Sequence, residues 1–262
     1  MSEPKVLFEE HGNIAVIKLN RPEKRNALDP ETVMMFNEFS EKAKDPKFRA
    51  VIVTGDESAF CGGADITAAA SEDGMGWESV EQALNEGYHV GLNNLIYMDK
   101  VVIAAVEGAC AGIGCAYYLS SDIAVMAKSS FFQIGFSKIA LIPDGGYNWV
   151  LTKVVGYQQA FRMAAEAKRV SAEECQSLGM CSEICEDGSA LDTAMELAKH
   201  YAELAPRAIF KTKHLMRDSF NKSYEQNLKD EAKMQEDMVG RKDNIEGVMA
   251  FVEKRKPKFT GE

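Results

Sequence analysis

Short hydrophobic runs recur along most of this chain, and their length and content of β-branched residues predict strands. We expect strands at Val6–Glu10, Ile14–Leu19, Ala50–Thr54, Val101–Val106, Ile123–Ala127, Phe131–Gln133 and Met180–Cys185. The first two runs flank the sequence His11-Gly12-Asn13, which predicts a hairpin.

Segments with helical periodicity separate these strands. Asp29 and Pro30 suit the N-cap and the first position of a helix whose apolar stripe includes Phe36 and Phe39. Further helices are expected at Trp77–Met98, Ile113–Ser121, Tyr147–Val155, Tyr157–Glu166, Ser171–Leu178 and Leu191–Ala205, and a mobile loop at residues 67–76. Because strands alternate with helices, the predicted fold class is α/β.

The last part of the chain has a different pattern. From Pro206 onward it is helical and highly charged, with no strand, so we expect a core at residues 1–200 and a helical region at residues 201–262. Its charged runs are typical of a solvated helix face. Its apolar positions, Phe210, Leu215, Met216, Phe220, Met238, Val248 and Phe251, favour packing against another subunit.

Two glycine-rich segments, Ala59–Ile66 and Glu107–Ala116, each follow the end of a predicted buried strand. Two such loops can aim backbone amides at one point, which is how proteins stabilise negative charge on a carbonyl oxygen. The alternative is that the glycines only allow close packing between strand and helix. If the loops converge, the chain is an acyl-group enzyme.

Composition and charge exclude several other functions. The 262 residues carry a formal net charge of −10, which argues against a general affinity for nucleic acids or anionic membranes. A basic cluster at Arg21, Lys24 and Arg25 leaves room for an anionic small ligand. The six cysteines form no CxxC pair, so we expect free thiols and no metal site. Without an apolar N-terminal segment or a membrane-length hydrophobic run, a cytoplasmic location is expected.

Five ordered segments of the chain resemble the crotonase, or enoyl-CoA hydratase/isomerase, superfamily. They are residues 19–28 (LNRPEKRNAL), Ala59–Ile66, Val102–Gly114 with the following Ser121-Asp122-Ile123, Ile139–Leu151 and Ala250–Phe259. The resemblance implies a spiral of ββα turns and a C-terminal helical region that packs between subunits. It also implies an acyl-CoA thioester substrate, no separate cofactor, and a homo-oligomer that is a trimer or a hexamer.

Carried over by position, the resemblance assigns the two oxyanion-hole amides to Ala64 and Ile113. It implies CoA contacts from Lys24, Arg25, Ala27, Ala64, Asp65 and Ile66. Taken without the resemblance, Lys24 and Arg25 are typical surface charges, and Asp65 is typical of an acid that bonds backbone amides.

The two glutamates that activate water in hydratases of this family are absent, since Ala116 and Phe136 stand at their positions. Asp144 remains, at the place where isomerases of the family carry an acid/base carboxylate. One carboxylate can remove a proton from one carbon and return it two carbons away. Burial beside Phe136 and Ile113 should raise its pKa. The local sequence Pro-Asp-Gly is equally typical of a plain turn.

Other candidates are weaker. In the 4-chlorobenzoyl-CoA dehalogenases of the superfamily, a histidine at the place of His89 is a catalytic base, although a packed histidine fits His89 as well. Phe136, Ala116, Tyr147 and Trp149 are candidates for the acyl pocket, with core packing as the alternative for the aromatic residues. Three glutamates of the expected loop and helix could supply a second carboxylate or form a solvated face: Glu78, Glu81 and Glu86.

The expected function is an enoyl-CoA isomerase with Asp144 as acid/base. The alternatives are an atypical enoyl-CoA hydratase, an aryl-CoA dehalogenase-like enzyme, and a non-catalytic acyl-CoA-binding protein.

Overall fold

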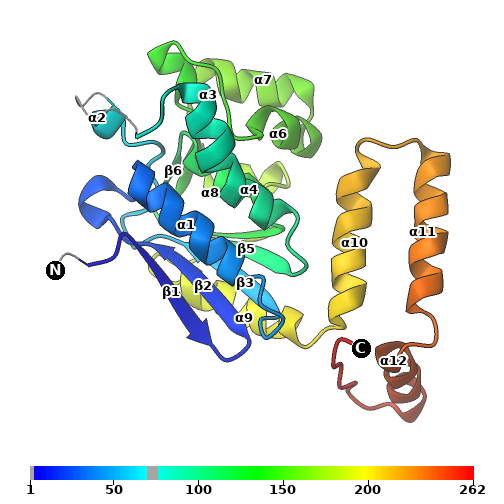
Figure 1. Cartoon of the computed structure of the whole chain (residues 1–262). Coiled ribbons are helices and arrows are strands. Elements are labelled where there is room, and N and C mark those ends of the chain that lie inside the picture. The colour runs from blue at the N-terminus through cyan, green and yellow to red at the C-terminus, as the bar shows by residue number, and fades with distance from the viewer. Residues whose placement is uncertain (1–2, 70–75) are drawn as a thin grey trace.

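Two β-sheets form the centre of the computed structural model, which describes residues 3–69 and 76–262 (Figure 1). The larger sheet has the order β1-β2-β3-β5-β7-β10, and its first pair is antiparallel while the others are parallel. Its strands are β1 (Val6–His11), β2 (Ile14–Leu19), β3 (Ala50–Thr54), β5 (Val101–Val106), β7 (Ile123–Ala127) and β10 (Glu183–Cys185).

The smaller sheet consists of four short strands in the order β4-β6-β8-β9. They are β4 (Ala59–Cys61), β6 (Ala109–Ala111), β8 (Phe131–Gln133) and β9 (Arg169–Ser171). The chain passes from a strand of the larger sheet to a strand of the smaller sheet and then into a helix. It does so at β3-β4-α2 (α2, Ile66–Ala69), at β5-β6-α5 (α5, Gly114–Ser120) and at β7-β8-η3 (η3, Phe136–Ile139). This ββα repeat is the spiral that the resemblance to the crotonase superfamily implies.

Both faces of the larger sheet are buried at its central strands, which explains why β3, β5 and β7 are continuously hydrophobic rather than alternating. On one face, Ala190, Ala194 and Ala198 of α9 (Ala190–Ala202) pack against Ile52 and Ile103 of the sheet. The other face contacts a core shared with α1 (Pro30–Lys42), α4 (His89–Ile96) and α5. The sheet is therefore a rigid base from which the glycine segments emerge.

The remaining helices of the core surround this spiral. They are η1 (Pro22–Lys24), α3 (Val80–Gln82), the π-helix η2 (Ala83–Tyr88), α6 (Tyr147–Val155), α7 (Tyr157–Glu166) and α8 (Ala172–Ser177).

Three sequence predictions differ from the structure in this part. The helix expected at Trp77–Met98 begins at Val80, because the Ser79 side chain accepts the Gln82 amide as an N-cap, and it contains a π-helical segment. Residues 67–69 belong to α2 rather than to a loop, and residues 70–75 of the expected loop lie outside the described residues. Strand β10 begins three residues later than expected, at Glu183.

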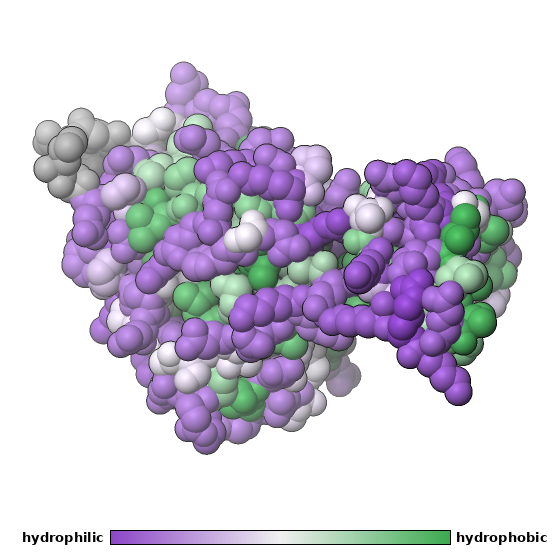
Figure 2. Space-filling view, turned by 90° about the horizontal axis from the view of Figure 1, so that it is seen from below, coloured by the Kyte–Doolittle hydropathy of each residue, from purple (hydrophilic) through white to green (hydrophobic). Residues whose placement is uncertain are grey.

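Three helices end the chain and extend away from the sheets (Figure 1). They are α10 (Pro206–Ser219), α11 (Tyr224–Met238) and α12 (Lys242–Glu253). Hydrophobic side chains gather at the end of this extension, at the right of Figure 2, and Phe251 on α12 is 86% exposed. No helix of the described residues is both long and apolar enough to cross a membrane.

Candidate active site

The two glycine segments lie side by side because their first residues pair as parallel strands. In this pairing of β4 with β6, Cys61 lies opposite Cys110. Ala64 follows Cys61 by three residues, and Ile113 follows Cys110 by three residues. These are the two residues expected to form the oxyanion hole. The register of the smaller sheet therefore brings the two expected donors to equivalent positions on neighbouring loops.

Glycine is required where the two loops touch. Gly63 has a φ of +98° and Gly112 a φ of +53°, which are left-handed conformations that residues with a Cβ rarely adopt. A Cβ added at Gly63 would lie 3.1 Å from the Ala111 carbonyl oxygen and 3.3 Å from the Gly112 Cα. The backbones are thus in van der Waals contact, and no side chain separates the amides of the next residues.

Neither the Ala64 amide nor the Ile113 amide donates a hydrogen bond to an acceptor within the described residues, although Ile113 is buried. The neighbouring amides form hydrogen bonds within the chain. The Asp65 amide donates to the Leu28 carbonyl at 2.9 Å, and the Gly112 amide donates to the Gln133 carbonyl at 3.1 Å. Buried amides are normally paired, so two unpaired amides on touching loops are available to a ligand oxygen.

Asp144 lies beside this pair of loops, in the segment between η3 and α6. The next residue, Gly145, has a φ of +66°, and a Cβ there would lie 2.7 Å from the Ala116 Cβ and 3.3 Å from Ile113 Cγ1. Asp144 Oδ1 is buried and has no hydrogen-bond partner in the described part of the chain. This burial raises the pKa of Asp144 to about 6.

The residues expected to line the acyl pocket have different neighbours in the structure. Ala116 and Phe136 are buried and offer no group that transfers a proton. Tyr147 is buried, stacks on Phe132 with 6.3 Å between ring centroids, and its hydroxyl has no partner among the described residues.

Trp149 lies at the contact between α6 and α10. Its ring meets the Phe220 ring edge-on at 5.5 Å, and the Lys153 ammonium lies 3.5 Å from its centroid. The place of Trp149 in the acyl pocket stays a prediction.

His89 is the first residue of α4, a helix that packs on α5. It is half-buried, and burial lowers its pKa, which favours the neutral imidazole. Its side chain forms no hydrogen bond or ion pair within residues 3–69 and 76–262.

Tyr88, which no sequence motif singles out, lies close to the site. It ends the π-helical segment and is buried, and its hydroxyl lies 3.4 Å from the Leu28 carbonyl oxygen, next to the point where Leu28 pairs with Ala64. Burial raises the pKa of Tyr88, and the nearby Cys61 and Asp144 raise it further. Segments of π-helix are frequent at functional sites, but no periodicity in the sequence predicts this one.

The expected CoA-contact residues lie beside the first glycine loop. Lys24 and Arg25 are exposed on and after η1, and the Arg25 carbonyl accepts the Gly62 amide at 2.8 Å. Ile66 is 62% exposed at the start of α2. These side chains are therefore reachable from solvent at the edge of the site.

Asp65 holds the same loop in place. Its carboxylate accepts from the buried Arg21 guanidinium at 3.0 Å and from the Thr67 amide at 3.1 Å, and Arg21 also donates to the Ala27 carbonyl. Asp65 and Ala27 thus anchor the loop through Arg21.

The glutamates weighed as a second carboxylate, Glu78, Glu81 and Glu86, are all exposed, as in a solvated helix face. Within the described ranges, no three His, Cys, Asp or Glu side chains come together as metal ligands.

The comparison with known proteins decides the family. The sequence model of the family described as enoyl-CoA hydratase/isomerase matches residues 9–262. This chain belongs to that family. It is 34% identical to a probable enoyl-CoA hydratase of Rhodobacter capsulatus, with all of both chains covered. It is 33% identical to the 1,2-epoxyphenylacetyl-CoA isomerase of Escherichia coli K12, with 98% of each chain covered.

Solved structures of the enoyl-CoA hydratase/isomerase family have the same fold. An enoyl-CoA hydratase from Polaromonas sp. JS666 superposes with a TM-score of 0.91 at 30% identity, covering 97% of this chain and 99% of that one. One from Bacillus anthracis superposes with a TM-score of 0.92 at 26% identity, covering 98% and 100%. The crotonase resemblance and the α/β fold are confirmed, while the relatives are named both as hydratases and as isomerases.

Proposed function

We propose that this family member is an isomerase that moves a double bond of an enoyl-CoA by proton transfer through Asp144. The observation that carries the proposal is the buried, unpartnered carboxylate oxygen of Asp144. It stands one residue before Gly145, which lies next to the side chain of Ile113, the residue that carries one of the two free amides. Acids and bases with raised pKa values in such places are candidates for catalysis.

In the proposed reaction, the thioester carbonyl oxygen accepts hydrogen bonds from the Ala64 and Ile113 amides. The Asp144 carboxylate removes a proton from C2 of a 3-enoyl-CoA, and the electron pair moves into the thioester to give a dienolate that the two amides stabilise. Asp144 then returns the same proton to C4, which leaves the double bond between C2 and C3. No proton is gained or lost, and no cofactor besides the CoA of the substrate is needed.

Hydration by two carboxylates is less well supported, since Ala116 and Phe136 offer no acid or base. The name of the Escherichia coli relative adds a second candidate substrate for the same site, 1,2-epoxyphenylacetyl-CoA. Both candidates are isomerisations of a CoA thioester, and both would use the amide pair.

The test uses the purified chain with a 3-enoyl-CoA, a 2-enoyl-CoA and 1,2-epoxyphenylacetyl-CoA as substrates. Replacing Asp144 with asparagine should lower kcat for isomerisation by about 10³-fold, which is within the usual contribution of a general acid/base. Binding of a saturated acyl-CoA should stay within about twofold, because the amide pair remains.

Asp192→Asn, which changes an exposed carboxylate on α9, is the matched control and should retain full activity. Full activity of Asp144→Asn would contradict the proposal. Water addition to the 2-enoyl-CoA without isomerisation would point to a hydratase, and tight binding without turnover of any substrate would point to a binding protein.

A further inference from the structure

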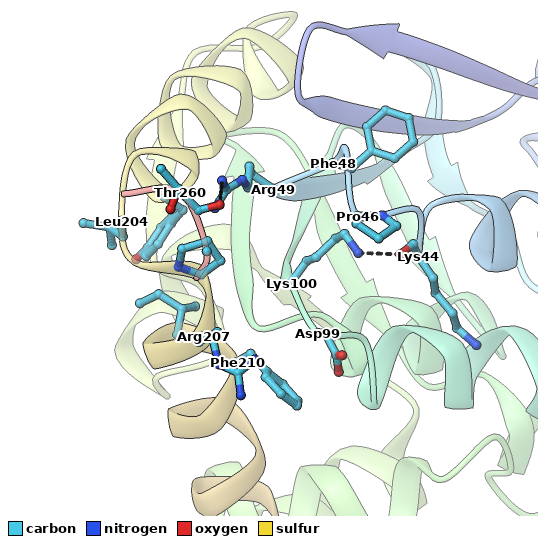
Figure 3. Close-up of a pocket in the computed structure, with 14 residues that line it drawn as sticks. Lys44, Pro46, Phe48, Arg49, Asp99, Lys100, Leu204, Arg207, Phe210 and Thr260 are labelled. Atoms are coloured by element: carbon cyan, nitrogen blue, oxygen red, sulfur yellow. Dashed lines mark hydrogen bonds between the residues drawn. The ribbon is translucent and has the colours of Figure 1, made fainter. Parts of the chain in front are cut away.

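A cavity of about 360 Å³ lies where strands β3 and β5 begin, whereas the glycine segments follow the other ends of these strands (Figure 3). Four segments line it: residues 44–49 before β3, residues 99–100 before β5, residues 201–210 at the junction of α9 and α10, and residues 260–261. Because β3 and β5 are parallel neighbours, both begin beside this cavity, and the glycine segments follow their other ends. Strands of five or six residues separate the two places by roughly 15–20 Å.

Lys100 brings a buried positive charge to this cavity. Its side chain is 8% exposed, and Nζ donates to the Lys44 carbonyl oxygen at 2.8 Å (Figure 3). An ammonium has three donors, and the described residues give this one no other acceptor. A buried charge with so little compensation is costly, and burial lowers the pKa of Lys100 although Asp99 and Asp45 act in the opposite direction.

Two arginines in the lining also have unused donors. Arg49 donates to the Thr260 carbonyl oxygen at 2.8 Å and forms no ion pair with a carboxylate of the described residues (Figure 3). Arg207 pairs with Asp237 at 3.2 Å, but its Nε is buried and has no partner in the described chain. Three cations with unmet hydrogen-bonding capacity therefore line one cavity, in a chain whose net charge is −10.

The rest of the lining is apolar, with one acidic group. Pro46, Tyr201, Pro206 and Phe210 add proline and aromatic surface to the lining. The Phe48 ring packs on Phe8 in the core instead. Asp99 supplies the carboxylate, which lies 3.5 Å from His214 Nε2 and is 62% exposed. The Lys44 ammonium adds no charge to the cavity, since it bonds Glu41 and Asn94.

We infer that this cavity binds a phosphomonoester carrying a hydroxyl-bearing ring system, of the class of a nucleoside monophosphate. Arginine and lysine donors suit a phosphate dianion. The Asp99 carboxylate can accept from a sugar hydroxyl, and the proline and aromatic surface suits a planar ring. The cavity volume lies at the lower end of the range for small-molecule sites.

The test is isothermal titration of the full chain with AMP, inorganic phosphate and adenosine, each in the presence of a saturating unreactive acyl-CoA. The acyl-CoA occupies the candidate active site, so that AMP cannot bind there in place of the CoA nucleotide. AMP should bind more tightly than phosphate, and adenosine should bind weakest, because the phosphate makes the charged contacts. Arg49→Gln and Arg207→Gln should each weaken AMP binding by at least about tenfold.

Arg162→Gln, an exposed arginine on α7, is the matched control and should bind AMP as the original chain does. Circular dichroism melting curves verify that each variant is folded, and the second arginine variant keeps the test informative if one fails. The inference is overturned if AMP and phosphate do not bind, or if AMP binding persists in both variants. Equal affinity for AMP and phosphate would overturn the assignment of a nucleoside. Because the readout is binding, loss of the proposed isomerase activity does not affect it.

Discussion

Asp144 is the residue whose ionisation most directly connects stability with activity. Its pKa is raised from an ordinary value of 3.8 to about 6 by burial, so the folded chain holds this proton more tightly than the unfolded chain. The stability from the protonated carboxyl is fully present below pH 3.8 and is lost as the pH rises through about 6. The Oδ1 atom of the resulting anion is then buried without a hydrogen-bond partner among the described residues.

We therefore expect Asp144→Asn to raise the free energy of unfolding at pH 8 by about 1 kcal/mol, with solvent screening keeping the gain modest. At pH 3.5 the gain should vanish. Urea denaturation at both pH values measures this, with Asp192→Asn as the exposed control. The same pKa places the inflection of kcat/KM near pH 6, with activity rising toward neutral pH. A destabilised Asp144→Asn at pH 8 would show that the carboxylate has a stabilising partner.

The individual residues of the candidate active site differ in how well the sequence predicts them. Ala64, Ile113 and Asp144 are placed by motifs, and the register of the smaller sheet and the Gly145 contact now give physical reasons for their proximity. Tyr88 depends on a π-helical segment that hydrophobic periodicity does not encode. The contact of Trp149 with Phe220, some seventy positions later in the chain, has no signal in the local sequence either.

At the level of elements, the long strands are predictable because burial on both faces gives continuous hydrophobic runs, as at Ala50–Thr54 and Val101–Val106. The short strands β4 and β6 are not, because each has three residues inside a glycine-rich segment and is too short for any period. Their pairing nevertheless sets the geometry of the site. The expected division at residue 200 stays a prediction, and α9 continues to Ala202.

Helix α10 places one buried residue, Lys213, against the core. Lys213 is 8% exposed, and its Nζ donates to the Leu95 and Lys100 carbonyl oxygens at 3.1 Å and to Asp122 at 2.7 Å. Arg217 also bonds Asp122, at 2.8 Å, so the aspartate keeps one partner if Lys213 is removed.

Replacing Lys213 with methionine should lower the free energy of unfolding by about 2–3 kcal/mol, since two carbonyls lose their donor. Hydrogen exchange should accelerate first in α10, which loses its attachment, while the sheets remain protected. Mass spectrometry of peptides after exchange measures both effects. Lys229→Met, on the exposed surface of α11, should change neither. Unchanged exchange in α10 of Lys213→Met would mean that other contacts hold the helix.

The molecule as a whole is asymmetric, with a sheet core and an extension of three helices (Figure 1). An apolar groove of about 930 Å³ runs between α10, α11 and α12, and its lining includes Leu215, Met238, Val248 and Phe251. Exposed apolar surface of this extent is typical of interaction sites. The groove therefore favours the expectation from the sequence that this region packs between subunits of a trimer or hexamer.

Phe251 offers the sharpest test of that expectation, because it lines the groove and is 86% exposed. Burying a phenylalanine contributes about 2–3 kcal/mol, and in a cyclic assembly the loss recurs at every interface. If the original chain sediments as the expected trimer or hexamer, Phe251→Ser should shift it toward the 28.9 kDa monomer. Phe161→Ser on α7 removes a ring that is 62% exposed outside the extension and should leave the assembly intact. A monomer for the original chain in analytical ultracentrifugation, or equal dissociation of both variants, would show that the helical extension does not hold subunits together.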